Sequence, residues 1–219
     1  MKIITNKWFE DAIDTSEEWI VSRTGIRERR FAEADELTSD LVVQAIKQLV
    51  AGNAGIDLIG VDFIMVATTT ADQLMPNTAS QVQNKLQVPN AGCLDLMAAC
   101  AGFVYGIILA KGLIAAGSHK KVLVIGAETL SKITDYNDRA SCILFGDGAG
   151  AVLVEPSVDV HILKSITGTD GSHGKDLYLS TQPRQINGEI IIPDGKIHQN
   201  GRAVFKWAVQ NMSLKVMNY

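Results

Sequence analysis

The chain has 219 residues, of which 47% are hydrophobic, and it carries a net charge of -4 at pH 7. This composition is typical of a globular protein that can bury one large core or two small ones. The acidic balance excludes a sequence-wide attraction to nucleic acid or to an anionic membrane surface. The three cysteines contain no Cys-x-x-Cys pair, and with no secretory leader this indicates a reducing, cytoplasmic setting and no metal site.

Helical and extended hydrophobic patterns alternate along the chain. Thr15 and Glu18 have capping-box spacing, which predicts a short helix that carries Trp19. Further helices are predicted from Thr38 to Gly52, over 77–86, from Ala101 to a C-cap at Gly117, and over 202–217. Buried strands are predicted at 61–67, 91–97, 121–125, 149–154 and 161–166. This alternation predicts a mainly parallel sheet covered on both faces.

Two segments depart from that rhythm. The stretch from Asp170 to Asn200 is rich in Gly, Pro, Asp, Asn and His, and it is predicted to be a long surface excursion with a hairpin. The longest apolar stretch, Leu96 to Ala110, ends at Lys111 and falls short of the ~20 residues that a membrane-spanning helix needs. No transmembrane segment is therefore expected.

Cys100 lies between the predicted strand 91–97 and the predicted buried helix that follows it. The unpaired N–H groups and the macrodipole of a helix N-terminus favour an anion by up to about 2 kcal/mol. They therefore favour the thiolate, which is the nucleophilic form of cysteine. An isolated cysteine in an apolar run is more often a small core residue, and Cys93 and Cys142 are expected to be buried thiols of that kind.

The surroundings of Cys100 resemble a known family. Four segments match in order along the chain, namely Asp14–Arg29 (DTSEEWIVSRTGIRER), Asp95–Phe103 (DLMAACAGF), Asp138–Arg139 and Phe145–Ala151 (FGDGAGA). Together they resemble β-ketoacyl-acyl-carrier-protein synthase III. The resemblance implies an α/β, thiolase-like αβαβα layered fold that is incomplete in this chain.

The resemblance also implies how the chain divides. Residues 1–156 would form the N-terminal thiolase-like half that carries the nucleophile, and 157–219 the connecting segment and the start of the second half. The chain is expected to be truncated at both ends, without the family's first strand and without the Pro-His-Gln-Ala-Asn, Gly-Asn-Thr-Ser and Gly-rich segments of the second half.

The activity that the resemblance implies is the initiation of fatty-acid synthesis. Cys100 would accept an acyl group, typically acetyl, from coenzyme A, and malonyl-acyl carrier protein would then condense with it after losing carbon dioxide. That second step needs the His and Asn donors of the absent segments. Coenzyme A thioester is a substrate here, no other cofactor is implied, and the complete enzyme would be a homodimer with no nucleic-acid or membrane partner.

Further site residues follow from the matched positions. The implied contacts with coenzyme A are Trp19, Arg23 and Arg139 with the neighbouring Thr15, together with Gly201 and Phe205 from the segment that opens the last helix. The implied acyl-pocket residues are Met75, at a position from which a partner subunit closes the pocket, and Phe145. Arg202 and Lys206 could offer positive charge to the acidic carrier protein.

Several alternatives stay open beside these assignments. Arg27, Arg29 and Arg30 fit a solvated basic face as well as a binding site, and the interleaved Glu28 argues against nucleic acid. The glycines after Phe145 lack the spacing of a dinucleotide site and predict a tight turn near the active site. The segment around His198 only superficially resembles the family's histidine motif, so His198 is not expected to be catalytic.

Two other functions remain possible at this point. The chain could be a catalytically incomplete fragment that at most accepts an acyl group or dimerises. It could also be a close thiolase-fold paralogue that makes another acyl condensation product. Neither the primer acyl chain nor the folding of the chain by itself follows from the sequence.

Overall fold

The computed structural model describes residues 1–217, with side chains described as far as residue 211, and it divides into two compact units that interleave along the chain. The first unit comprises Met1–Lys2, Arg30–Leu130 and Gly146–Lys164. The second unit comprises Ile3–Arg29, Ser131–Phe145 and the residues from Ser165 onward.

A four-stranded sheet forms the centre of the first unit. Its strands are β3 (Phe63–Ala67), β4 (Gly92–Leu96), β5 (Val122–Thr129) and β6 (Asp147–Val154). The order is β4-β3-β5-β6, with β3 parallel to both neighbours and β6 antiparallel to β5. The helices of this unit are α3 (Thr38–Gly52), α4 (Thr78–Lys85) and α5 (Gly102–Ala115), with the short 3-10 helix η1 (Ala99–Ala101) before α5.

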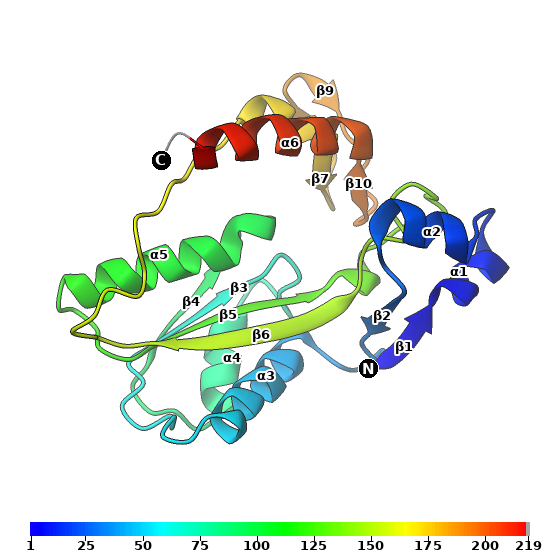
Figure 1. Cartoon of the computed structure of the whole chain (residues 1–219). Coiled ribbons are helices and arrows are strands. Elements are labelled where there is room, and N and C mark those ends of the chain that lie inside the picture. Colours follow the sequence, from blue (N-terminus) through cyan, green and yellow to red (C-terminus); the bar gives the residue numbers. More distant parts are fainter. Residues whose placement is uncertain (218–219) are drawn as a thin grey trace. The chain divides into compact units, whose positions relative to one another are not determined.

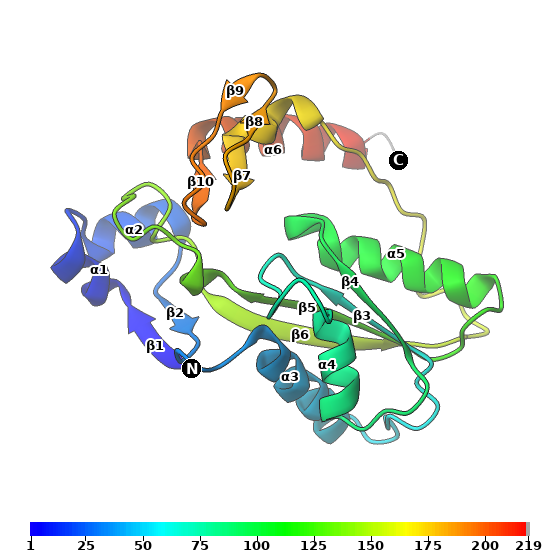
Figure 2. The ribbon, with the colours of Figure 1, turned by 180° about the vertical axis from the view of Figure 1, so that it is seen from behind.

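Helices cover both faces of this sheet, as the sequence pattern predicted (Figures 1 and 2). On one face, Ile64 and Val66 of β3 and Ile125 of β5 pack against apolar residues of α3 and α4. On the other face, Met65 and Val124 pack against α5. The alternation follows from the two-residue period of a strand, and it explains why β3 and β5 are apolar on both sides.

The helix ends follow local rules. The backbone N–H of Leu37 donates to the carboxylate of Asp40 (2.9 Å) and so helps to satisfy the open N-terminus of α3. Helix α5 ends before Gly117, which has a φ of 72° that a residue with a side chain adopts at a cost. The C-cap is Ala116, so the glycine that was predicted as the C-cap lies one position beyond it.

Short elements make up most of the second unit. They are α1 (Asn6–Ala12), α2 (Glu17–Thr24), η3 (Gly171–Asp176), β7 (Leu177–Leu179), β8 (Gln185–Ile186), β9 (Glu189–Ile190), β10 (Ile197–Gln199) and α6 (Gly201–Met217), together with most of η2 (Leu130–Lys132), whose first residue belongs to the first unit. The strands β1 (Lys2–Thr5) and β2 (Glu28–Phe31) pair with each other, and the division between the units passes through both. The sequence predicted no element before Asp14, where β1 and α1 lie.

The surface excursion from Asp170 to Asn200 contains the predicted hairpin. Strands β8 and β9 pair antiparallel around Asn187 and Gly188, which both have positive φ values (52° and 82°). An Asn-Gly pair tolerates this left-handed geometry, which matches the twist of the two strands. Strands β7 and β10 pair antiparallel beside it and lead the chain into α6.

Two local predictions were wrong. Residues 161–166 were expected to form a strand, but they have no strand partner, and Leu163 is 71% exposed there. A short apolar run forms a strand only where a neighbouring strand offers backbone hydrogen bonds, and these residues have no such neighbour among the residues that the structure describes. The N-cap of α2 is Ser16, whose hydroxyl accepts from the backbone N–H of Trp19 (3.1 Å), so the expected cap at Thr15 is displaced by one residue.

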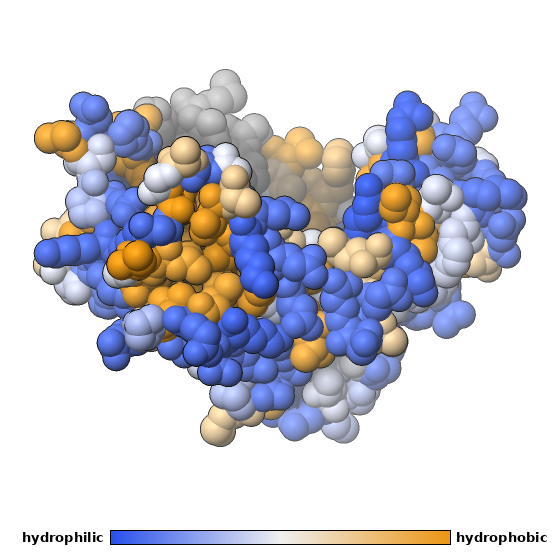
Figure 3. Space-filling model, turned by 90° about the horizontal axis from the view of Figure 1, so that it is seen from below, coloured by the Kyte–Doolittle hydropathy of each residue, from blue (hydrophilic) through white to orange (hydrophobic). Residues whose placement is uncertain are grey.

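The surface combines polar and apolar areas. Hydrophobic residues gather in a broad patch on one face, and hydrophilic residues border it (Figure 3). Despite these apolar stretches, none of the helices within residues 1–217 has the length and hydropathy needed to cross a membrane.

Candidate active site

Cys100 lies in η1, where strand β4 gives way to helix α5, as the sequence predicted. A Cβ atom built on Gly102 would lie 3.0 Å from the Cβ of Ala67 at the end of β3, so the start of α5 rests directly on the sheet. Ala99 has a φ of 43°, which turns the chain sharply before the cysteine. The thiol of Cys100 is consequently exposed at the strand ends.

Two further glycines hold α5 close to β5. A Cβ on Gly106 would lie 2.7 Å from Cγ1 of the buried Val124, and a Cβ on Gly126 would lie 3.4 Å from the ring of Phe103. Larger side chains at these positions would push the helix away from the strand. The glycines therefore set the height of α5, and with it the position of Cys100, above the sheet.

Cys100 opens into a cavity of about 450 Å³ within the first unit. The side chain of Phe103 lines it together with the segment Gly146–Gly150 at the start of β6. The glycine segment was predicted to be a tight turn near the active site, and it does share this cavity with the cysteine, although strand geometry begins already at Asp147. Asp147 itself is buried and accepts a hydrogen bond from the backbone N–H of Ala32 (2.6 Å).

Glu128 lines the same cavity, and the sequence analysis did not identify it. Its carboxylate accepts hydrogen bonds from the backbone N–H and the hydroxyl of Thr69 (2.8 and 2.9 Å) and from the hydroxyls of Thr68 and Thr70. A half-buried charge needs such donors to offset its lost hydration. Polar residues that end adjacent parallel strands meet at one sheet edge, which indicates the general place of Glu128 and the threonines but not which of them pair.

Asp95 of the matched cysteine segment has a structural role. Its two carboxylate oxygens accept from the backbone N–H groups of Thr78 (2.7 Å) and Ala79 (2.8 Å) in the first turn of α4. A carboxylate at a helix N-terminus satisfies open donors and complements the helix dipole. The acidic residue near Cys100 thus fixes α4 against β4 and is committed to these bonds.

The other two cysteines differ from Cys100 in exposure. Cys142 is buried, as expected, whereas Cys93 is only partly buried, which corrects the expectation of a fully buried thiol. Burial is the main cause that raises the pKa of both thiols, and the nearby carboxylates of Asp138 and Asp95 raise the pKa of Cys142 and Cys93 further. Both are therefore poor nucleophiles at neutral pH.

In the second unit, Trp19 and Arg139 lie together. The guanidinium carbon of Arg139 is 5.4 Å from the ring centroid of Trp19, which is 38% exposed. Arg23 is exposed in the last turn of the same helix. Thr15 precedes that helix, and within residues 1–217 its buried hydroxyl oxygen has no hydrogen-bond partner.

The residues assigned to α6 share the first two turns of that helix. Arg202, Phe205 and Lys206 are exposed, and Phe205 shows 72% of its surface. Arg202 and Lys206 are four positions apart and so lie on one helix face. The backbone N–H of Ala203 donates to the Asn200 side chain (3.3 Å), which caps this end next to Gly201.

The two residues assigned to the acyl pocket belong to different units. Met75 is 86% exposed, and the adjacent Leu74 is 98% exposed, in the loop between β3 and α4 of the first unit. Phe145 is half-buried and belongs to the second unit. Within the first unit, the residues that line a cavity together with Cys100 include Phe103 and the segment Gly146–Gly150.

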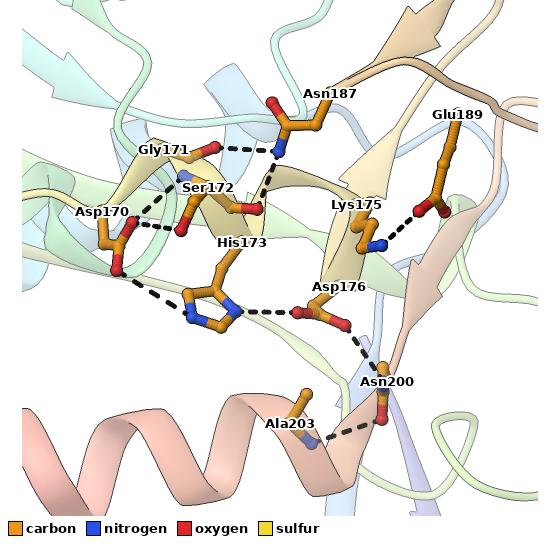
Figure 4. Close-up of polar contacts among 10 residues, drawn as sticks. All are labelled: Asp170, Gly171, Ser172, His173, Lys175, Asp176, Asn187, Glu189, Asn200 and Ala203. Carbon is orange, nitrogen blue, oxygen red and sulfur yellow. Dashed lines mark hydrogen bonds and ion pairs between the residues drawn. The ribbon is translucent and has the colours of Figure 1, made fainter.

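His198 and His173 are engaged in local pairs. Nε2 of His198 lies 3.0 Å from a carboxylate oxygen of Asp194, and its ring stacks on Tyr178 with centroids 4.9 Å apart. This pairing accounts for His198 without a catalytic role. His173 lies between Asp170 and Asp176 in η3 (Figure 4). No group of three His, Cys, Asp or Glu side chains in the described part of the chain is arranged to hold a metal ion.

Comparison with known proteins identifies relatives along almost the whole chain. A family model described as 3-oxoacyl-acyl-carrier-protein (ACP) synthase III matches residues 94–171. The chain is 50% identical over 211 residues to β-ketoacyl-acyl-carrier-protein synthase III 2 of Halalkalibacterium halodurans, covering 95% of this chain and 63% of the relative. It is 49% identical over 210 residues to the protein of the same name from Bacillus subtilis, covering 95% and 64%.

Solved structures give the same result for the fold. A β-ketoacyl-acyl-carrier-protein synthase III from Thermus thermophilus superposes with a TM-score of 0.89 at 45% identity, covering 95% of this chain and 64% of that one. A crystal structure of 3-oxoacyl-acyl-carrier-protein synthase III superposes with a TM-score of 0.86 at 31% identity, covering 96% and 67%. The predicted thiolase-like α/β fold is thereby confirmed, and the chain spans 63–64% of the length of the two curated relatives.

Proposed function

Because this chain belongs to the 3-oxoacyl-acyl-carrier-protein synthase III family, we propose that Cys100 accepts an acyl group from an acyl-coenzyme A thioester. The observation that carries the proposal is the exposed thiol in η1, at the start of α5 and at the edge of a cavity of about 450 Å³. In the complete enzyme, malonyl-acyl carrier protein then condenses with the bound acyl group and loses carbon dioxide. This reaction begins fatty-acid synthesis.

The acylation step follows from ordinary thioester exchange. The sulfur of Cys100 attacks the thioester carbonyl carbon, and the C–S bond to coenzyme A breaks as the new C–S bond forms. The thiolate of coenzyme A leaves and takes up the proton that Cys100 has lost. Since one thioester replaces another, the step needs no redox partner, and coenzyme A is a substrate rather than a resident cofactor.

Coenzyme A is proposed to bind in the second unit. The exposed ring of Trp19 offers a stacking surface for the adenine, and Arg139 and Arg23 offer charge to the phosphates. Arg139 already lies 5.4 Å above this ring, so the adenine competes with its guanidinium for the indole face. Thr15, Gly201 and Phe205 are proposed as further contacts.

Carrier protein and acyl chain are assigned to other surfaces. Arg202 and Lys206 present two positive charges on one face of α6, which suits an acidic carrier protein. Met75 is proposed to close the acyl pocket of a partner subunit in a homodimer, because two large apolar side chains at this loop are almost fully exposed. Phe145 is proposed to line the acyl pocket. A cytoplasmic location is proposed together with these substrates.

Incubation of the purified chain with acetyl-coenzyme A tests the proposal. Intact-mass spectrometry is expected to show one added acetyl group that hydroxylamine removes, and Cys100→Ala is expected to abolish it. Cys142→Ala is the matched control, because it removes a thiol that is buried in the second unit. Acetylation that persists in Cys100→Ala would contradict the role of this residue.

A second function is kept because the chain spans less than two thirds of the curated relatives' length. In this alternative the 219 residues form a catalytically incomplete fragment that at most accepts an acyl group or dimerises. Binding of acetyl-coenzyme A without any mass increase would favour this alternative. A close paralogue with another condensation product would instead be acylated by a different acyl-coenzyme A.

A further inference from the structure

A single imidazole lies between two carboxylates in the 3-10 helix η3. Nδ1 of His173 is 2.9 Å from a carboxylate oxygen of Asp176, and Nε2 is 3.9 Å from a carboxylate oxygen of Asp170 (Figure 4). A carboxylate of Asp176 can only accept, so Nδ1 carries the proton of this hydrogen bond. The ring therefore bonds to Asp176 at the end of η3 and lies beside Asp170 at its start.

The carboxylate of Asp176 also contacts Asn200, the residue that precedes helix α6. The second carboxylate oxygen of Asp176 accepts from the side-chain amide of Asn200 (3.0 Å), and its backbone carbonyl accepts from the backbone N–H of Asn200 (2.8 Å). His173 thus bonds to the residue through which η3 holds the start of α6.

Asn200 extends this link to the helix terminus. Its side-chain oxygen accepts from the backbone N–H of Ala203 (3.3 Å), and its backbone carbonyl accepts from that of Val204 (3.0 Å). An N-cap satisfies donors that have no partner inside the helix. A continuous chain of hydrogen bonds therefore runs from His173 through Asp176 and Asn200 into the first turn of α6.

We propose that His173 is a positioning residue that fixes the N-terminal end of α6 for the binding of coenzyme A. The proposal rests on the proposed function, which assigns Gly201 and Phe205 to coenzyme A. The same proposed function assigns Arg202 and Lys206 of this helix to the acidic carrier protein. His173 touches neither ligand. It acts by holding Asp176 in the orientation that keeps Asn200 at the helix cap.

The electrostatics of the turn are consistent with this role. The hydrogen bond from His173 is the main cause that holds the pKa of Asp176 below its ordinary value, and the amide of Asn200 lowers it further. Asp170 is held mainly by Ser172, whose hydroxyl and backbone N–H both donate to it (2.6 and 3.1 Å). Both carboxylates are therefore ionised and able to hold their partners at neutral pH.

The turn also supplies a matched control. Lys175 lies in η3 between the linked residues, and its ammonium pairs with Glu189 of strand β9. Glu189→Gln breaks an ion pair of the same turn and leaves the bonds among His173, Asp176 and Asn200 in place. A general loosening of η3 and a specific loss of the link to α6 can therefore be told apart.

Hydrogen exchange and coenzyme A titration test the proposal on the full chain. His173→Ala is expected to raise amide exchange at Ala203 and Val204 two- to fivefold and to weaken coenzyme A binding by a similar factor, the range for half-exposed polar pairs. His173→Gln keeps an N–H that can reach Asp176 and is expected to restore part of both losses. Glu189→Gln is expected to change neither, and the alkylation rate of Cys100 should stay constant throughout.

Three results separate the possible failures. Equal exchange at Ala203 and Val204 in His173→Ala and Glu189→Gln would overturn the link. Faster exchange with unchanged coenzyme A affinity would overturn the positioning role. If the unsubstituted chain bound no coenzyme A, the proposed function would fail instead, and the exchange comparison would still decide whether His173 holds the helix.

Discussion

Substitution of Gly106 by alanine tests how tightly α5 must pack for Cys100 to reach its position. The new Cβ would lie 2.7 Å from Cγ1 of Val124, a fully buried and stiff β-branched side chain that cannot turn aside. Such overpacking costs about 1–3 kcal/mol. Replacing glycine by alanine inside a helix stabilises it by about 1 kcal/mol. The stability of Gly106→Ala is therefore expected to lie between that of the unsubstituted chain and about 2 kcal/mol below it.

Gly112→Ala in the same helix is the matched control, because a Cβ there has nothing within 4 Å. It gains the helix propensity without the clash and is expected to stabilise the chain by up to about 1 kcal/mol. Urea denaturation followed by circular dichroism measures both variants against the unsubstituted chain. Equal stabilisation by the two substitutions would refute the claim that glycine at 106 sets the height of α5.

Three further predictions concern single contacts. Asp95→Asn should destabilise the chain by about 1–3 kcal/mol in urea denaturation, because the charged acceptor for the N–H groups of Thr78 and Ala79 is lost; unchanged stability would contradict the capping role. Limiting iodoacetamide at pH 7 should modify Cys100 first and Cys142 last, as mass spectrometry would show, since Cys100 is exposed and burial raises the pKa of Cys142. The hydrogen bond from His173 lowers the pKa of Asp176 in the folded chain, so the contribution of Asp176 to stability is present above the unfolded pKa of about 3.9 and is lost as the pH falls further. Asp176→Asn should therefore flatten the acid limb of a curve of unfolding free energy against pH. An unchanged acid limb would contradict the assignment.

The strands, helices and nucleophile were predictable because they depend on local patterns. Apolar runs of strand length predicted β3 to β6, and the strand-to-helix boundary predicted the place of Cys100. The N-cap of α2 shows the limit of such patterns, because Thr15 was predicted and Ser16 is the residue that caps the helix. Adjacent hydroxyls give nearly the same signal, and the fold decides which of them meets the open N–H group.

Contacts between distant segments were not predictable in the same way. Glu128 receives its donors from the loop after β3, and Asp176 receives Asn200 from beyond a hairpin. Each pairing depends on how strands align in the folded chain, which spacing along the sequence does not specify. The error at 161–166 has the same origin, because a strand forms only where a neighbouring edge offers its hydrogen bonds.

Locating the acyl group by fragmentation of a single peptide tests the central claim most directly. After reaction with acetyl-coenzyme A, trypsin releases residues 86–111, which contain both Cys93 and Cys100. Fragment ions that separate the two cysteines are expected to carry the added mass on Cys100 alone. An acetyl group on Cys93, or an unmodified peptide from a chain that binds acetyl-coenzyme A, would contradict the assignment of Cys100 as the acyl acceptor.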